Sequence, residues 1–426
     1  MKGSFGEAYR ERMRVRPVVA SLALVAATMS SVVGGSPPGG AASKVAPFEP
    51  ISVSFSSTKQ GWVLGTLACA HERRCLTMLE TVNAGQSWFD VQLPVPFVKV
   101  INHSDNDTSG LNVHFANPED GWVYGDEPAT IHQGDQTYSG WKSVLWATHD
   151  GGTRWERQVV PGMIAQGTVY DVESSRTTVY VLAPSKSGGA EVESAPVGSN
   201  TWRRANHVAL NGPAGGALPS GSMVLEGDTG WLIFGNDRGT TGSAQLTTRG
   251  TWMTWRSPCA SVGHGYAVPA AANTRDLVVV CGMGGFAYPM PKSAPRGAAI
   301  GSSWLYFSTN GGATFKVGRE IRPVKANLSF GQFAGVLASP RPGVVMLSRY
   351  VGNVEQLVVS HGSGARWSVV FTGSVSYLSF TSSSEGVGLV SSRNGNQPEN
   401  MIMSFDGGQH WRTVSFSLAT LIGNLP

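Results

Sequence analysis

Charged side chains are scarce in this chain of 426 residues, because Asp, Glu, Lys and Arg together make up only 14% of it. An ordinary globular domain contains about 25%. The shortage excludes a coiled coil, a helical bundle and a charged disordered chain. Glycine and proline are abundant instead, with 54 and 24 residues, while 41% of the chain is hydrophobic. This composition favours many short strands that are joined by turns around a sizeable core.

The chain also lacks a basic stripe. Its formal net charge is +4, and residues 1–16 alone contain five basic side chains against two acidic ones. The rest of the chain is therefore almost neutral. Binding of nucleic acid needs Lys and Arg clustered on one face, so we expect no nucleic-acid partner.

An uncharged segment follows the basic N-terminal residues. Residues 17–43 contain no Asp, Glu, Lys or Arg, and residues 18–27 form a mostly apolar run. Basic, apolar and small-residue regions in this order are typical of a secretory signal. We predict a signal peptide over residues 1–42, a linker over residues 43–50, and a protein that is secreted or held in the cell envelope. An uncleaved anchor is the alternative, and only that alternative predicts contact with a membrane.

Cysteine is also rare, with four residues in the chain. No two of them have the Cys-x-x-Cys spacing of many zinc sites, although His71 lies between the first two. An even number in an exported chain favours disulfides, which we expect to involve Cys69 with Cys75 and Cys259 with Cys281. Zinc is the alternative. We predict no metal and no cofactor.

One segment partly resembles a calcium-binding loop. Asp105, Asp107 and Gly110 have the spacing of its first half. Ala116 stands where a bidentate glutamate closes such a loop, so calcium is not predicted.

One octapeptide pattern, Ser/Thr-x-Asp-x-Gly-x-x-Trp, recurs through the chain. Two segments match it in full, two have Asn in place of Asp, one has Gly there, and two are degenerate. The full matches are residues 148–155 and 404–411, and the versions with Asn are residues 81–88 and 308–315. Residues 360–367 have Gly in the acidic position, and the degenerate copies end at Trp202 and Trp255. The residues that we predict to be structural in these segments are Asn83, Trp88, Asp150, Trp155, Asn310, Phe315, Trp367, Asp406 and Trp411.

The residue types of this octapeptide suit a tight turn. The hydroxyl and the carboxylate accept hydrogen bonds from backbone amides, and glycine adopts a positive φ at little cost. The terminal aromatic residue is expected to pack its ring into the blade, which is the small sheet that each repeat unit forms. A carboxylate that is used in this way is not a general acid.

Short apolar strands precede each octapeptide, several of them with a Gly-Trp pair such as Gly61-Trp62, Gly121-Trp122 or Gly230-Trp231. Each unit reads as strand, turn, strand, hairpin, strand, octapeptide and strand. Seven units predict an all-β fold, a single seven-bladed β-propeller over residues 51–426 with four antiparallel strands per blade. The octapeptide turns would join the third and fourth strands. The ring closes either by addition of residues 44–50 to the last blade or by packing alone.

The Gly-Trp strands and the Thr-x-Asp-Gly-Gly-x-x-Trp turns resemble the Asp-box, or bacterial neuraminidase repeat (BNR), propellers. The resemblance covers residues 50–417 and extends to propellers of the photosystem II stability and assembly factor type and to sialidases. It implies the propeller fold. It implies no single function, because sialidases, xyloglucanases, sortilin-like receptors and assembly factors all contain such boxes.

The topology of a blade sorts its loops onto two faces. The octapeptide turns share one face with the turns between first and second strands. The opposite face has the hairpins between second and third strands, both cysteine pairs and the long insertions of blades 2 and 5. These insertions are either a binding surface or solvated loops of varied length. Their candidate ligand residues are Asp105, Asp126, Glu127, Tyr138, Trp141, Phe286 and Tyr288.

No catalytic set is recognisable. The Arg-Ile-Pro motif of sialidases is absent from the early blades, and the nearest string, Ile321-Arg322-Pro323, has another order. We predict an exported, non-catalytic, monomeric scaffold that binds a protein or a cell-envelope polymer. The alternative is a glycoside hydrolase in which Asp105 would act with Asp126 or Glu127.

Overall fold

The computed structural model divides the chain into two units, Met1–Lys44 and Val45–Pro426. The residues that the structure describes belong to the second unit and are 48–67, 75–94, 110–133, 136–163, 169–185, 189–205, 210, 220–236, 239–261, 267–282, 303–321, 333–351, 354–391 and 398–416. The predicted signal peptide lies outside them. Within these ranges, no helix has the length and apolar character that crossing a membrane requires.

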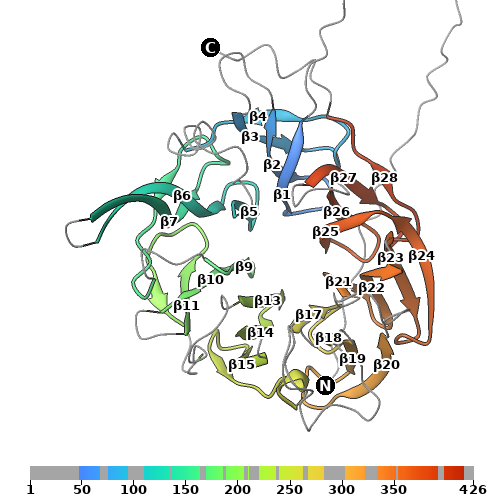
Figure 1. Ribbon diagram of the computed structural model, residues 1–426. Coiled ribbons are helices and arrows are strands. Elements are labelled where there is room, and N and C mark those ends of the chain that lie inside the picture. The colour runs from blue at the N-terminus through green and yellow to red at the C-terminus, as the bar shows by residue number, and fades with distance from the viewer. Residues whose placement is uncertain are drawn as a thin grey trace, which may run out of the picture. The chain divides into compact units, whose positions relative to one another are not determined.

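Seven four-stranded antiparallel sheets form the blades of a ring (Figure 1). Blade 1 consists of β1 (Glu49–Phe55), β2 (Gly61–Leu67), β3 (Cys75–Thr81) and β4 (Phe89–Val91), and blade 2 of β5 (Asn112–Phe115), β6 (Gly121–Gln133), β7 (Gln136–Thr148) and β8 (Glu156–Arg157). Blade 3 consists of β9 (Asp171–Ser174), β10 (Thr178–Pro184), β11 (Ala190–Pro196) and β12 (Arg203–Arg204), and blade 4 of β13 (Ser220–Glu226), β14 (Thr229–Asn236), β15 (Gly239–Leu246) and β16 (Trp252–Thr254). Blade 5 consists of β17 (Ala267–Ala271), β18 (Leu277–Gly282), β19 (Ser303–Ser308) and β20 (Lys316–Ile321), and blade 6 of β21 (Phe333–Arg341), β22 (Val344–Val351), β23 (Val354–His361) and β24 (Arg366–Thr372). Blade 7 consists of β25 (Ser374–Phe380), β26 (Gly386–Ser391), β27 (Pro398–Ser404) and β28 (Arg412–Thr413).

Every sheet uses four strands that are consecutive in the sequence, paired in the order first, second, third and fourth. The first strands lie nearest the centre of the ring (Figure 1). The predicted all-β, seven-bladed propeller with four antiparallel strands per blade is therefore confirmed.

Each second strand contains an apolar run because both sides of the strand are covered there. All seven residues of β2 are buried. Trp62 and Leu64 pack toward blade 2, whereas Val63, between them, packs toward blade 7. Alternate side chains of a strand point to opposite faces of the sheet, so each blade buries one set against each neighbour.

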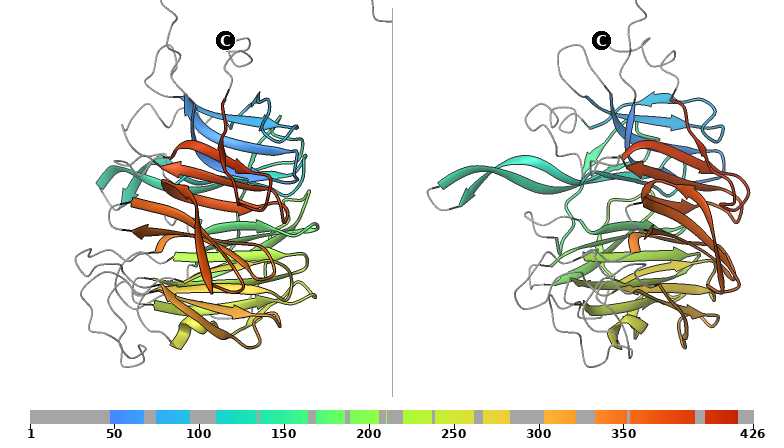
Figure 2. Two further views of the ribbon diagram at one scale, coloured as in Figure 1. Left: turned by 90° about the vertical axis from the view of Figure 1, so that its right-hand side faces the viewer. Right: turned by 45° about the vertical axis from the view of Figure 1, so that its right-hand side comes forward.

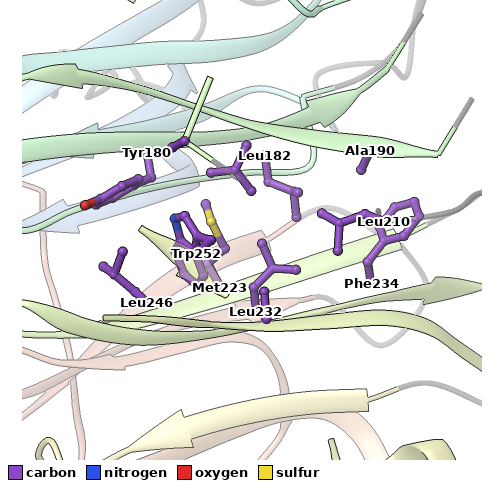
Figure 3. Packing of buried hydrophobic residues seen from close by; sticks show 12 residues of the cluster. Tyr180, Leu182, Ala190, Leu210, Met223, Leu232, Phe234, Leu246 and Trp252 are labelled. Atoms are coloured by element: carbon purple, nitrogen blue, oxygen red, sulfur yellow. The ribbon is translucent and has the colours of Figure 1, made fainter. Parts of the chain in front are cut away.

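Seven hydrophobic clusters therefore form the core, one between each pair of neighbouring blades. The cluster between blades 3 and 4 shows the arrangement, since Tyr180 and Leu182 of β10 face Phe234 and Trp252 of the next blade (Figure 3). Complete burial of one large apolar side chain contributes about 1.5–3 kcal/mol. The ring is thus stabilised by contacts between blades, which no single blade could make alone.

The ring closes by packing of blade 7 against blade 1. All four strands of blade 7 come from the C-terminal part of the chain, so within the described ranges no N-terminal strand completes that sheet. Val53 and Val63 of blade 1 pack instead against Leu389 and Met401 of blade 7. Among the described residues the closure therefore relies on side chains, while residues 44–47, which the other predicted closure would use, lie outside them.

Candidate functional site

The octapeptide turns join third to fourth strands, and those of blades 1, 2, 5 and 7 have one hydrogen-bond pattern. In blade 2 the Thr148 hydroxyl donates to Asp150 Oδ1 (3.0 Å) and accepts from the amide of Gly152 (2.8 Å). The amide of Arg154 donates to Asp150 Oδ1 (2.8 Å). The same bonds occur at Thr81 with Asn83, at Ser308 with Asn310 and at Ser404 with Asp406. Each turn therefore uses its own polar groups.

The hydrogen bonds also keep the turn carboxylates ionised. The amide of Arg154 is the main cause that lowers the pKa of Asp150. Burial raises the pKa of Asp406, but bonds from His410 and Ser404 outweigh this effect and lower it to about 2. A group with such a low pKa holds no proton to donate at neutral pH. Both carboxylates are engaged by hydrogen bonds within their own turns.

The aromatic residue of each turn packs against the preceding blade. The indole N–H of Trp155 donates to the carbonyl of Gln92 in blade 1 (2.8 Å), and its ring joins the cluster between blades 1 and 2. Gly152 has a φ of 94°, and a Cβ there would lie 2.5 Å from Val91 Cγ1. The ring thus packs against its own blade, with Phe115 at 6.4 Å between centroids, and also against the preceding one.

Blade 4 corrects the sequence alignment of the turns. Trp252 follows the turn at the start of β16, is fully buried, and lies between blades 3 and 4. Trp255 lies three residues further on, between blades 4 and 5, where its N–H donates to the carbonyl of Gly312 (2.9 Å). Trp252 is therefore the counterpart of the other turn aromatics, and the degenerate copy does not end at Trp255.

The opposite face of the ring, the hairpin face, carries an extended two-stranded arm, residues 126–143. β6 and β7 are each 13 residues long and pair from Gly121 with Thr148 to Gln133 with Gln136. β5 pairs with β6 only as far as Tyr124, so in the described part of the chain no third strand pairs with the arm. Figure 2 shows the arm reaching out from the ring.

Two candidate ligand residues lie at the root of this arm. Asp126 Oδ1 accepts a hydrogen bond from the Ser143 hydroxyl (3.0 Å), and Glu127 forms an ion pair with Arg157 (2.9 Å). Both interactions tie the base of the arm to its partner strand or to β8.

The other candidate ligand residues are less fully described. Tyr138 pairs with Ile131 and Trp141 with Pro128 along the backbone of the arm, and their side chains lie outside the description. Asp105, Phe286 and Tyr288 lie outside the described residues altogether. Asp126 and Glu127 are consecutive in β6, so their side chains point to opposite faces of the strand, and the grouping of all seven stays a prediction.

A disulfide links Cys259 to Cys281, with their Cα atoms 5.2 Å apart. Cys259 belongs to the short 3-10 helix η2 (Pro258–Ser261) and Cys281 to β18, so the bond fixes the connection between blades 4 and 5. Cys75 is also disulfide-bonded, and its expected partner Cys69 lies outside the described residues. Within the part that the structure describes, no group of three His, Cys, Asp or Glu residues is arranged to hold a metal ion.

A cavity of about 570 Å³ lies at the centre of the ring. It is lined by the first strands of blades 3 to 7 and by residues that directly follow the first strands of blades 5 and 7. Three carboxylates line it: Asp171 and Glu173 from β9 and Glu226 from β13. Asp171 Oδ2 accepts a hydrogen bond from the amide of Met223 in the next blade (2.7 Å). Tyr377 of blade 7 lines the same cavity.

The cavity is electrostatically unusual. Burial raises the pKa of Asp171 to about 6. Burial, with the charges of Asp171 and Glu226, raises the pKa of Glu173 well above its ordinary value. Burial likewise raises the pKa of Tyr377 to about 12, with smaller effects from Glu173 and Asp171 on the far side of the ring. Acids with raised pKa values in a cavity are typical of functional sites.

Sequence reasoning missed this cavity. Its three carboxylates stand in two ordinary strands, 55 residues apart at the extremes, and no motif marks them. The alternation of β9 could have indicated a polar channel, because the acidic residues Asp171 and Glu173 flank buried Val172. Such a strand is polar on one side although it lies nearest the ring's centre.

No family model matches the sequence, and no curated protein matches it either. Solved structures do. YCF48 bound to D1 peptide has a TM-score of 0.50 at 14% identity, over 85% of this chain and 94% of that one. The PL25 polysaccharide lyase, an ulvan lyase, has a TM-score of 0.51 at 10% identity, over 90% and 99%. The β-propeller domain of the Trilobed protease from Pyrococcus furiosus has a TM-score of 0.46 at 9% identity, over 90% and 99%. The similarity to the first two structures shows the propeller fold alone and, at these identities, leaves function to the site.

Proposed function

We propose that this protein is an exported, non-catalytic scaffold that binds a polypeptide on its hairpin face. The buried disulfide between Cys259 and Cys281 supports a location outside the cytoplasm, because such bonds persist in oxidising compartments. The octapeptide carboxylates support a non-catalytic ring, since their oxygens are already bonded to their own turns. We expect the scaffold to be monomeric.

The arm is the observation that carries this proposal. A two-stranded ribbon alone is only marginally stable in water, and its edges leave backbone N–H and C=O groups unpaired. An extended peptide can add to such an edge as a further strand, using those backbone groups for affinity. The candidate aromatics Tyr138 and Trp141 belong to this arm and are suited to anchor a partner.

The comparisons are compatible with this role. YCF48, a propeller of the same fold, has been solved with a bound peptide. A glycoside hydrolase at the hairpin face is less well supported, because Glu127 is already paired with Arg157 and Asp126 with Ser143. A catalytic carboxylate pair needs one group free to protonate the leaving oxygen.

Shortening the arm tests the proposal. Replacement of residues 128–141 by Asn-Gly joins Glu127 to Lys142, which already face each other in the ladder, through a two-residue hairpin turn. The full-length and shortened proteins are then used to capture binding proteins and polysaccharides from cell-envelope extracts, with thermal melting to confirm folding. A variant with Asp150→Asn on the octapeptide face is the matched control.

We expect the wild type and the Asp150→Asn variant to capture the same polypeptide and the shortened protein to lose it. If the Asp150→Asn variant loses binding at an unchanged melting temperature while the shortened protein still binds, the assignment of binding to the hairpin face is wrong. Capture of a polysaccharide that the protein then cleaves favours the hydrolase instead.

A further inference from the structure

The central cavity has two chemically different walls. Blades 3 and 4 contribute the carboxylates of Asp171, Glu173 and Glu226. Blades 5 to 7 border the rest of the cavity with their first strands, on which Val268 is half-buried and Ser376 and Tyr377 are exposed, whereas Ala270, Val336, Leu337 and Leu378 are buried between the blades. No Lys, Arg or His is among the described residues that line the cavity, so nothing there neutralises the three acids.

Glu173 is the group that most needs a partner. The protein encloses it within the ring, while part of its surface stays open to the cavity. Its carboxylate receives no hydrogen bond from the described residues, whereas the neighbouring Asp171 is fixed by the amide of Met223. An enclosed charge without a hydrogen bond or counter-ion is costly, and a cation that enters the cavity would remove that cost.

The shape of the charge distribution selects the kind of cation. A small metal ion needs several oxygens converging at short distance, and the described residues offer no such cluster of three. An alkylammonium ion instead needs acids at one end and apolar contact along its methylene chain. The three carboxylates border the same volume of about 570 Å³ as Val268 and Tyr377, and this volume is within the usual range for a small ligand.

We propose that the acidic wall of Asp171, Glu173 and Glu226 binds an alkylammonium group, whose methylene chain lies along Val268 of β17 and the ring of Tyr377 of β25. The group comes either from a free polyamine or from a lysine side chain of a polypeptide that enters the ring. This site is independent of the arm, so it can exist whether or not the hairpin face binds a partner.

Isothermal titration calorimetry on the full chain tests the proposal with three probes: spermidine, a short lysine-rich peptide and calcium chloride. The variant is Glu173→Gln with Glu226→Gln, which keeps side-chain shape while it removes two charges. Glu119→Gln, on an exposed turn, is the matched control. Because the double variant removes the repulsion among the three carboxylates, its melting temperature should be unchanged or raised. If the double variant does not fold, Glu226→Gln alone replaces it.

We expect at least one amine probe to bind the wild type and the Glu119→Gln control equally, and the double variant to bind it about tenfold more weakly. Tighter binding of spermidine identifies a free polyamine, and tighter binding of the peptide identifies a lysine side chain. Absence of amine binding, or equal binding by the double variant, overturns the proposal. The proposal is also overturned if the wild type binds calcium but neither amine, and the double variant no longer binds calcium.

Discussion

The ring of Phe48, just before the first strand, lies 4.6 Å from the ring of Phe416, just after the last strand, measured between centroids. This pair joins the two ends of the propeller. Phe48 is 3% exposed and belongs to the cluster between blades 7 and 1. Because no strand is shared across this junction in the described residues, side-chain packing has to hold it closed.

We therefore predict that Phe48→Ala lowers the free energy of unfolding by about 3–5 kcal/mol, the usual cost of truncating a buried aromatic side chain. Chemical denaturation followed by tryptophan fluorescence measures it. Phe89→Ala is the control, since Phe89 is 46% exposed on β4 and its loss should cost little. Equal stability of the two variants would show that the closure does not depend on this packing.

The fold could be predicted because its information is local. Thr148, Asp150 and Gly152 build their turn from neighbouring residues, so the pattern appears in the sequence itself. The cavity could not, because Glu173 and Glu226 meet only when separate blades close into a ring. Trp252 and Trp255 show the same limit. Both are aromatic residues near the turn, and only the direction in which each packs tells them apart.

The turn of blade 2 allows a sharp test of its carboxylate. Asp150→Ala leaves the amide of Arg154 without its acceptor, so we expect a loss of about 1–3 kcal/mol in the free energy of unfolding. Asp150→Asn should be almost neutral, because Asn83 and Asn310 make the same bond in blades 1 and 5. Thermal and chemical denaturation of both variants provide the comparison.

A different outcome would change the role of this residue. If Asp150→Ala abolished a binding or catalytic activity and left the melting temperature unchanged, Asp150 would be functional rather than structural. The corresponding pair of changes at Asp406 in blade 7 repeats the test in a second turn with the same bonds.

Glu385 predicts a pH dependence of stability. It lies in the turn between β25 and β26, is 6% exposed, and its Oε1 has no hydrogen-bond partner. Burial raises its pKa from 4.5 to about 7. As the pH rises between these values, the unfolded state loses this proton while the folded state keeps it, so folding becomes less favourable. The stabilising effect of protonation is complete below the lower value and absent above the higher one.

Replacement of Glu385 by Gln should therefore raise the free energy of unfolding by about 1–3 kcal/mol near pH 8 and leave it almost unchanged near pH 4. Denaturation curves across this pH range measure the effect. Glu119→Gln, at an exposed position, should keep the wild-type profile. A Glu385→Gln profile that runs parallel to the wild type would mean that Glu385 does not titrate in this window.

The last prediction concerns the disulfide between Cys259 and Cys281, which are 4% and 1% exposed. The bond closes a loop over a sequence separation of 22 residues, so its removal frees the unfolded chain. We expect Cys259→Ala with Cys281→Ala to lower the free energy of unfolding by about 2–4 kcal/mol. Reductant should destabilise the wild type by more than this, because it also breaks the bond at Cys75. In the double variant, reductant should remove only that second contribution. A double variant as stable as the oxidised wild type would show that the connection between blades 4 and 5 is held by packing around Trp304 and Leu277 alone.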